Sequence, residues 1–70
     1  MYKEMKRLIQ VMEMIEMDKR ELLQCDYDDY DEIAQNLLDL FVRSNDLKDS
    51  VVKTLTRMKH ERRKSERGND

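Results

Sequence analysis

The sequence predicts an all-α protein folded as an antiparallel helical hairpin, and three observations support this prediction. Proline is absent and the only glycine is Gly68, so no strong helix breaker precedes that residue. Apolar residues recur every three or four positions along two stretches, which is the period of a helix packed against another helix. Between the two stretches lies an acidic segment, residues 25–32, whose composition is typical of a turn and a helix start.

The first helix is expected from about residue 2 to residue 24. Its predicted seam toward the second helix consists of Met5, Leu8, Met12, Ile15 and Leu22. Lys19 takes the one polar position in that seam, while Ile9, Val11, Met14 and Met17 are apolar residues that lie off it. A hairpin needs only one apolar stripe on each helix. The excess predicts a second contact, either with another copy or with a partner protein.

The turn is expected at residues 25–29. Asp28 and Asp29 are both N-cap candidates, because a carboxylate can accept hydrogen bonds from the free N–H groups of a helix's first turn. If Asp29 is the cap, Glu32 lies three residues later and completes a pattern similar to a capping box. The second helix is therefore predicted to begin near Tyr30.

The predicted seam of the second helix consists of Tyr30, Ile33, Leu37, Leu40, Ser44, Leu47, Val51, Thr54 and Met58. Leu38 and Phe41 widen this apolar face. A break at Ser44-Asn45, both N-cap residue types, would give a three-helix bundle instead. Because the seam passes through these residues in register, one helix from about 30 to 63 is favoured. We expect a single helical domain over residues 1–66, with a frayed basic and polar tail at 64–70.

The size of the chain predicts oligomerisation. A domain of 70 residues rarely gains more than about 3–5 kcal/mol from its own core, so small domains usually add a disulfide, a metal or a second subunit. Cys25 is the only cysteine and cannot form a disulfide within the chain. We therefore expect a homodimer, assembled as a four-helix bundle. The architecture is reminiscent of helical hairpins that dimerise in this way, an analogy of fold that implies no function.

No constellation for catalysis, metal binding or a cofactor is predicted. The acidic segment does not match an EF-hand loop, which needs glycine at its sixth position and glutamate at its twelfth. His60 has no catalytic partner residue near it in the sequence, so we do not expect an enzyme. The segment is interpreted as a charged turn. Its alternative role is an acidic docking patch formed by Asp26, Tyr27, Asp28 and Tyr30.

The second helix ends in a basic stretch. The candidate basic patch consists of Arg57, Lys59, Arg62, Arg63 and Lys64. Such a stretch can complement the helix dipole, bind an acidic protein or bind nucleic acid. Interspersed glutamates and missing aromatic residues weaken the nucleic-acid interpretation, and the lack of an adjacent apolar face argues against membrane binding.

The function expected from these patterns is non-catalytic. We expect a small adaptor or regulator that binds another protein through an apolar helical face bearing methionines. The candidate interface consists of Ile9, Met14, Met17, Leu38 and Phe41. Two alternatives remain: a nucleic-acid-associated helical dimer that uses the basic end, and a structural coiled-coil subunit of a larger assembly. The single thiol and the absence of a visible secretory signal predict a cytoplasmic protein.

Overall fold

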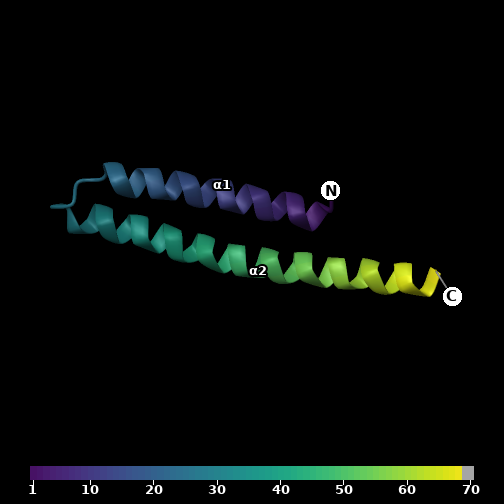
Figure 1. Cartoon of the computed structure of the whole chain (residues 1–70). Helices are drawn as coiled ribbons and strands as arrows, with labels where there is room; N and C mark the ends of the chain where they lie inside the picture. The colour runs from purple at the N-terminus through teal and green to yellow at the C-terminus, as the bar shows by residue number, and fades with distance from the viewer. Residues whose placement is uncertain (69–70) are drawn as a thin grey trace.

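The computed structural model is a hairpin of two helices that lie side by side (Figure 1). It describes the backbone of residues 1–68 and the side chains of residues 1–63. Helix α1 spans Lys3–Gln24, and α2 spans Tyr30–Gly68. The molecule measures 64 × 16 × 12 Å, and α2 continues well beyond the start of α1 (Figure 1). The predicted helical hairpin is confirmed, and α2 ends five residues later than the predicted residue 63.

Helix α2 runs without a break through Ser44 and Asn45, so the three-helix alternative is excluded. The Ser44 hydroxyl donates a hydrogen bond to the carbonyl of Leu40, 2.8 Å away and one turn earlier in the same helix. A hydroxyl bonded to the preceding turn does not cap a new helix. Local side-chain bonding therefore supports continuation of the helix at this position.

The turn is stabilised by two aspartates. The backbone N–H of Asp28 donates to the Asp26 carboxylate at 2.9 Å, and the N–H of Asp29 donates to the Asp26 carbonyl at 3.0 Å. The Asp29 carboxylate then accepts from the N–H of Glu32 at 3.2 Å. This is the N-cap geometry that the sequence predicts for Asp29, and it determines where α2 begins.

The contact between the helices is rotated relative to the predicted seam. In α1, Val11, which the sequence places off the seam, is fully buried, whereas Met12, which the sequence places in the seam, is 55% exposed. The predictions for Val11 and Met12 are therefore wrong. Leu8, Ile15 and Leu22 belong to both the predicted and the observed contact, and each is only partly buried.

Helix α2 shows the same rotation. Ser50, which lies next to the predicted seam, is buried, whereas the predicted seam residues Leu37, Val51 and Met58 are exposed. Thr54 is buried as predicted and belongs to both seams. Thr54 can be buried because its hydroxyl donates to the carbonyl of Ser50 at 2.8 Å. The two helices thus pack through a seam of polar and apolar residues, and several of the more apolar residues are left exposed on the surface of the hairpin.

A cross-helix ion pair lies in the observed seam and favours it. Arg43 Nε lies 3.7 Å from Asp18 Oδ2, and neither buried atom has a hydrogen-bond partner. These two opposite charges therefore lie next to each other in the seam. Lys19, which the sequence places in the seam, is exposed in the structure and pairs with Glu16 at 3.9 Å. Burial of an unpaired charge is the more expensive arrangement.

Two further contacts fix the ends of the hairpin. The Arg57 guanidinium lies 5.7 Å from the centre of the Tyr2 ring and also pairs with Glu61 at 3.1 Å. At the other end, Cys25 is buried, and its thiol donates to the carbonyl of Leu22 at 3.1 Å. Of these contacts, the one between Tyr2 and Arg57 joins the two helices, as the central Asp18–Arg43 pair does, and both are consistent with a single register between α1 and α2.

Candidate interaction surface

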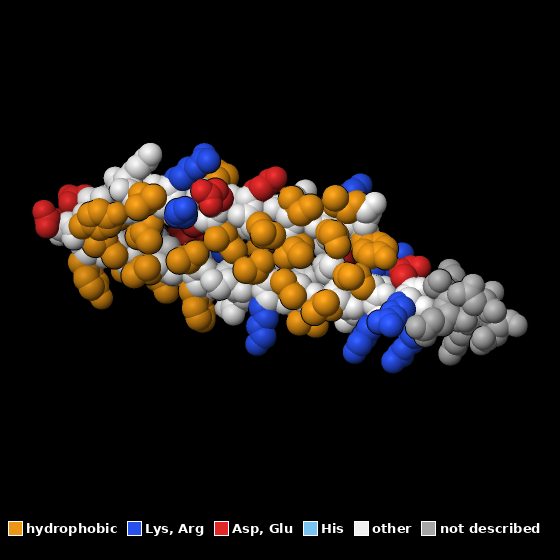
Figure 2. Space-filling view, viewed as in Figure 1, with side chains coloured by type: hydrophobic (Ala, Val, Ile, Leu, Met, Phe, Trp, Pro, Cys, Tyr) orange, Lys and Arg blue, Asp and Glu red, His pale blue; other side chains and the backbone are white. Residues whose placement is uncertain are grey.

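One broad face of the hairpin is covered with hydrophobic side chains from both helices (Figure 2). Met12 and Phe41 directly follow the seam residues Val11 and Leu40, and the other residues of this face are related to these two, or to one another, by helical steps of three, four, eleven or fourteen positions. We call this the apolar face, and it consists of Ile9, Met12, Leu23, Leu37, Phe41, Val51, Leu55 and Met58. All eight side chains are exposed.

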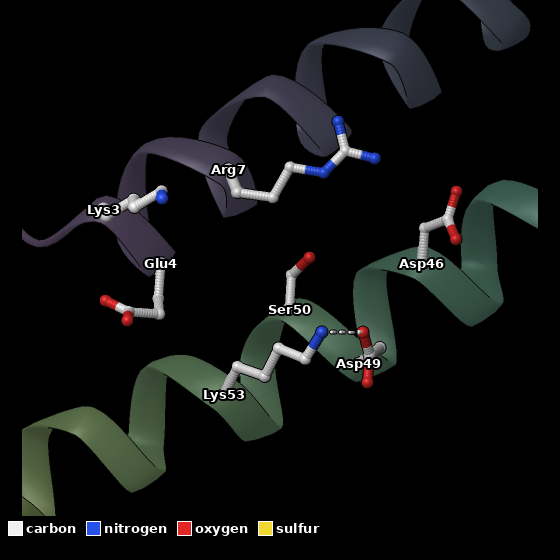
Figure 3. Close-up of a pocket in the computed structure, with 7 residues that line it drawn as sticks. All are labelled: Lys3, Glu4, Arg7, Asp46, Asp49, Ser50 and Lys53. Atoms are coloured by element: carbon white, nitrogen blue, oxygen red, sulfur yellow. Dashed lines mark ion pairs between the residues drawn. The ribbon is translucent and has the colours of Figure 1, made fainter.

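The opposite face is polar. Figure 3 views the hairpin from this side, where Lys3, Arg7 and Asp46 line an open groove between the helices. Lys53 pairs with Asp49 at 3.0 Å, and Ser50 points toward α1 in the same view (Figure 3). A second open groove lies nearer the turn and is lined by polar residues together with Cys25. The first groove mixes cations with carboxylates, the second mixes carboxylates with amides, and neither is an enclosed cavity, so neither forms a defined ligand site.

The structure divides the predicted interface residues between several surfaces. Ile9 and Phe41 lie together on the apolar face. Met14 and Met17 lie seven residues from groove-lining residues of α1, so they point to the polar side. Met14 is partly buried, and Met17 is exposed. Leu38 is exposed on the side of α2 that faces away from α1.

The residues of the predicted acidic docking patch are all exposed. Tyr27 and Tyr30 are 60% and 81% exposed, so neither ring is packed into the hairpin. The Asp26 carboxylate is occupied in the turn, where it accepts the N–H of Asp28. The patch therefore combines one structural carboxylate with aromatic rings and further charges that are accessible.

The basic patch lies where α2 passes the start of α1. Arg57 is already engaged by Tyr2 and Glu61. Lys59, Arg62 and Arg63 are exposed. Lys64 lies outside the residues whose side chains the structure describes.

The described residues contain no group of three or more His, Cys, Asp or Glu placed to hold a metal ion. Within the same part of the chain, neither helix has an apolar stretch sufficient to cross a membrane.

Sequence reasoning missed several residues of the apolar face because it assigned them to the helix contact. The predicted and observed seams share every second residue, and the remaining residues of one seam lie one position away from those of the other. Helical periodicity therefore fits Met12, Leu37, Val51 and Met58 in the predicted seam as well as it fits Val11 and Ser50 in the observed one. The signal that distinguishes them is the opposite charge of Asp18 and Arg43. A seam that contains both residues provides each with a partner.

Comparisons of the chain with protein-family models, with curated proteins and with solved structures find no match.

Proposed function

We propose that this protein is a non-catalytic interaction module that pairs with a second copy through its apolar face to form a four-helix bundle. In this role it acts as an adaptor or regulator. Exposed apolar residues outside that face, including Met17, Leu38 and Val52, are available to another protein. The single thiol, Cys25, suits a reducing compartment, and we propose the cytoplasm as the place of action.

The observation that supports assembly is the imbalance between buried and exposed apolar residues. Among residues 1–63, the only buried hydrophobic side chains are Val11 and Cys25. The apolar face alone exposes eight larger or similar side chains. Monomeric proteins rarely leave a continuous apolar surface of this kind in water, because covering it is favourable by about 25 cal/mol per Å².

The nucleic-acid alternative has less support. The cation nearest to the body of the hairpin, Arg57, already contacts Tyr2 and Glu61. Glu61 also places a carboxylate within the basic stretch, where it would repel phosphate. Binding of this kind would decrease steeply with salt concentration, which distinguishes it from binding through an apolar surface.

Sedimentation equilibrium over a wide concentration range, with far-UV circular dichroism on the same samples, tests the proposal. We expect a helical dimer whose dissociation is accompanied by loss of helicity, because the isolated hairpin has a thin core. A helical monomer that melts cooperatively at the same temperature at every concentration would contradict the proposal.

A further inference from the structure

The two ends of the hairpin carry opposite charges. The turn holds five carboxylates within residues 26–32, and all are exposed. At the other end, residues 57–63 of α2 hold four cations and one carboxylate. The molecule is 64 Å long, and charges are screened over roughly 8 Å at physiological salt, so these ends cannot neutralise each other within one chain.

The apolar face connects these ends and is the surface that a second copy would cover. Where the two helices lie side by side, it is about 33 Å long and 16 Å wide, and its eight apolar side chains are all exposed. The face is contributed by both helices (Figure 2), so two copies that meet there place four helices around one core.

We propose that the second copy lies antiparallel on the apolar face, so that the acidic turn of each copy contacts the basic end of the other. This inference rests on the proposed dimer and adds its orientation. The register within one chain supports it, because the contact of Tyr2 with Arg57 places the basic end level with the start of α1. When the two-helix parts of two antiparallel copies overlap, each turn therefore lies level with the other copy's basic end.

The parallel arrangement is less favourable for the same electrostatic reason. It would bring ten carboxylates from two turns to one end and eight cations with two glutamates to the other. Like charges at such distances repel each other, and opposite charges steer association and select the orientation. In the antiparallel dimer, a twofold axis perpendicular to the helices relates the two copies. The contact between an acidic turn and a basic end therefore occurs twice in each dimer.

Distances between spin labels test the orientation directly. In a Cys25→Ser background, Tyr27→Cys provides a single labelling site at the exposed turn, and His60→Cys provides one at the basic end. For the Tyr27→Cys dimer we expect a separation of about 30 Å or more, because the 22 residues of α1 span about 33 Å. An equimolar mixture of the two labelled variants should add a separation below roughly 20 Å, about two helix diameters.

A short distance in the Tyr27→Cys dimer alone would overturn the antiparallel arrangement. The absence of a short distance in the mixture would overturn it as well, since the ends would not meet. Sedimentation equilibrium on the same samples separates these outcomes from failure of the proposed dimer. If a dimer forms in the wrong orientation, only this inference fails, whereas a monomer contradicts both.

Charge reversal provides an independent test of the cause. Asp28→Lys, Asp31→Lys and Glu32→Lys together change the net charge of residues 26–32 from −5 to +1 and leave the Asp29 cap in place. Arg62→Glu with Arg63→Glu changes the net charge of residues 57–63 from +3 to −1. Each set of changes should weaken the dimer about tenfold at low salt, and the chain that carries all five should regain affinity. Glu13→Lys with Asp39→Lys, two exposed carboxylates between the ends, is the control and should change affinity by less than about threefold.

The combined variant is the decisive sample, because it restores complementary ends only in an antiparallel dimer. In a parallel dimer the turns would still repel each other. Unchanged dissociation constants after the reversals at low salt, or no recovery in the combined variant, would overturn the inference. Circular dichroism of each variant shows whether the hairpin itself is retained.

Discussion

Asp29 shows how a single carboxylate defines an element boundary. Its side chain accepts the N–H of Glu32, and its carbonyl accepts the N–H of Ile33 at 3.1 Å, so it begins α2 with both side chain and backbone. No glycine or proline assists the turn. The start of α2 therefore depends on Asp26 and Asp29.

Asp29→Ala should lower the free energy of unfolding by about 1 kcal/mol, because it leaves first-turn N–H groups without their acceptor. Asp31→Ala is the matched control. Asp31 is also exposed and acidic, but it acts on the helix only through the dipole, so its loss should have about half that effect or less. Urea unfolding of both variants at one protein concentration measures the difference. Equal effects would mean that charge, rather than capping, is responsible.

The Asp18–Arg43 pair lies in the seam, and we expect it to favour the observed register. Asp18→Leu should lower the free energy of unfolding by about 2 kcal/mol, since Arg43 then stays in the seam without a counter-charge. Arg43 is more than a third exposed, so solvent limits this penalty. Asp18→Leu with Arg43→Leu should restore the stability of the original chain or exceed it, because an apolar pair packs without desolvating a charge.

A double-mutant cycle in urea measures this coupling. The Arg43→Leu single variant completes the cycle and should also be destabilised. Single variants as stable as the original chain would show that the pair does not determine the seam.

At the scale of the elements, helix boundaries follow from local sequence, whereas the faces that meet do not. Periodicity and capping residues predict α1 and the start of α2 to within a residue. They leave two seams that share Leu8, Ile15 and Leu22. The choice between these seams depends on Asp18 and Arg43, which lie 25 positions apart and interact only once the hairpin has formed.

The same limit explains which parts of the candidate surface could be predicted. Ile9 and Phe41 lie outside both seams, so the sequence identifies them as surface residues in either case. Met12 belongs to one seam and is exposed when the other is used. Met14 and Met17 are also outside the predicted seam, but they point to the polar side. Sequence spacing alone does not indicate which side of the hairpin is apolar.

Ser44 provides a test of α2 as one continuous element. Ser44→Ala should raise the free energy of unfolding by about 0.5 kcal/mol and retain full helicity, because alanine is a better helix former and the hydroxyl bonds only within α2. A helix break at this position would give the opposite sign, a loss of about 1 kcal/mol, since a cap would be removed. Urea unfolding with far-UV circular dichroism gives the sign. Asn45 is the neighbouring residue that could also cap a helix, so Asn45→Ala is the control for a helix break displaced by one position.

At the scale of the whole molecule, the hairpin is a helical scaffold whose largest apolar surface lies outside. Its seam is held by Val11, the Asp18–Arg43 pair and small residues such as Ser50. That seam specifies register but contributes little hydrophobic free energy. Stability and assembly are therefore expected to be linked: the chain should be most helical where the apolar face is covered, and its melting temperature should rise with concentration.

Phe41→Glu tests this link because it places a charge on the apolar face without touching the seam. Phe41 is 65% exposed in the hairpin, so a monomer should tolerate the change, whereas a four-helix bundle would bury the new carboxylate twice. We expect dimer affinity to fall by at least about a hundredfold and helicity to decrease at low micromolar concentration.

Val42→Glu is the matched control, because Val42 is 55% exposed on the same helix but faces the polar side. It should leave the dimer intact, with a melting temperature that still rises with concentration. Sedimentation equilibrium and thermal melts at several concentrations distinguish the two variants. If both lose affinity equally, the contact is not confined to the apolar face. If neither does, the face is not an interface, and the thin seam alone maintains the hairpin.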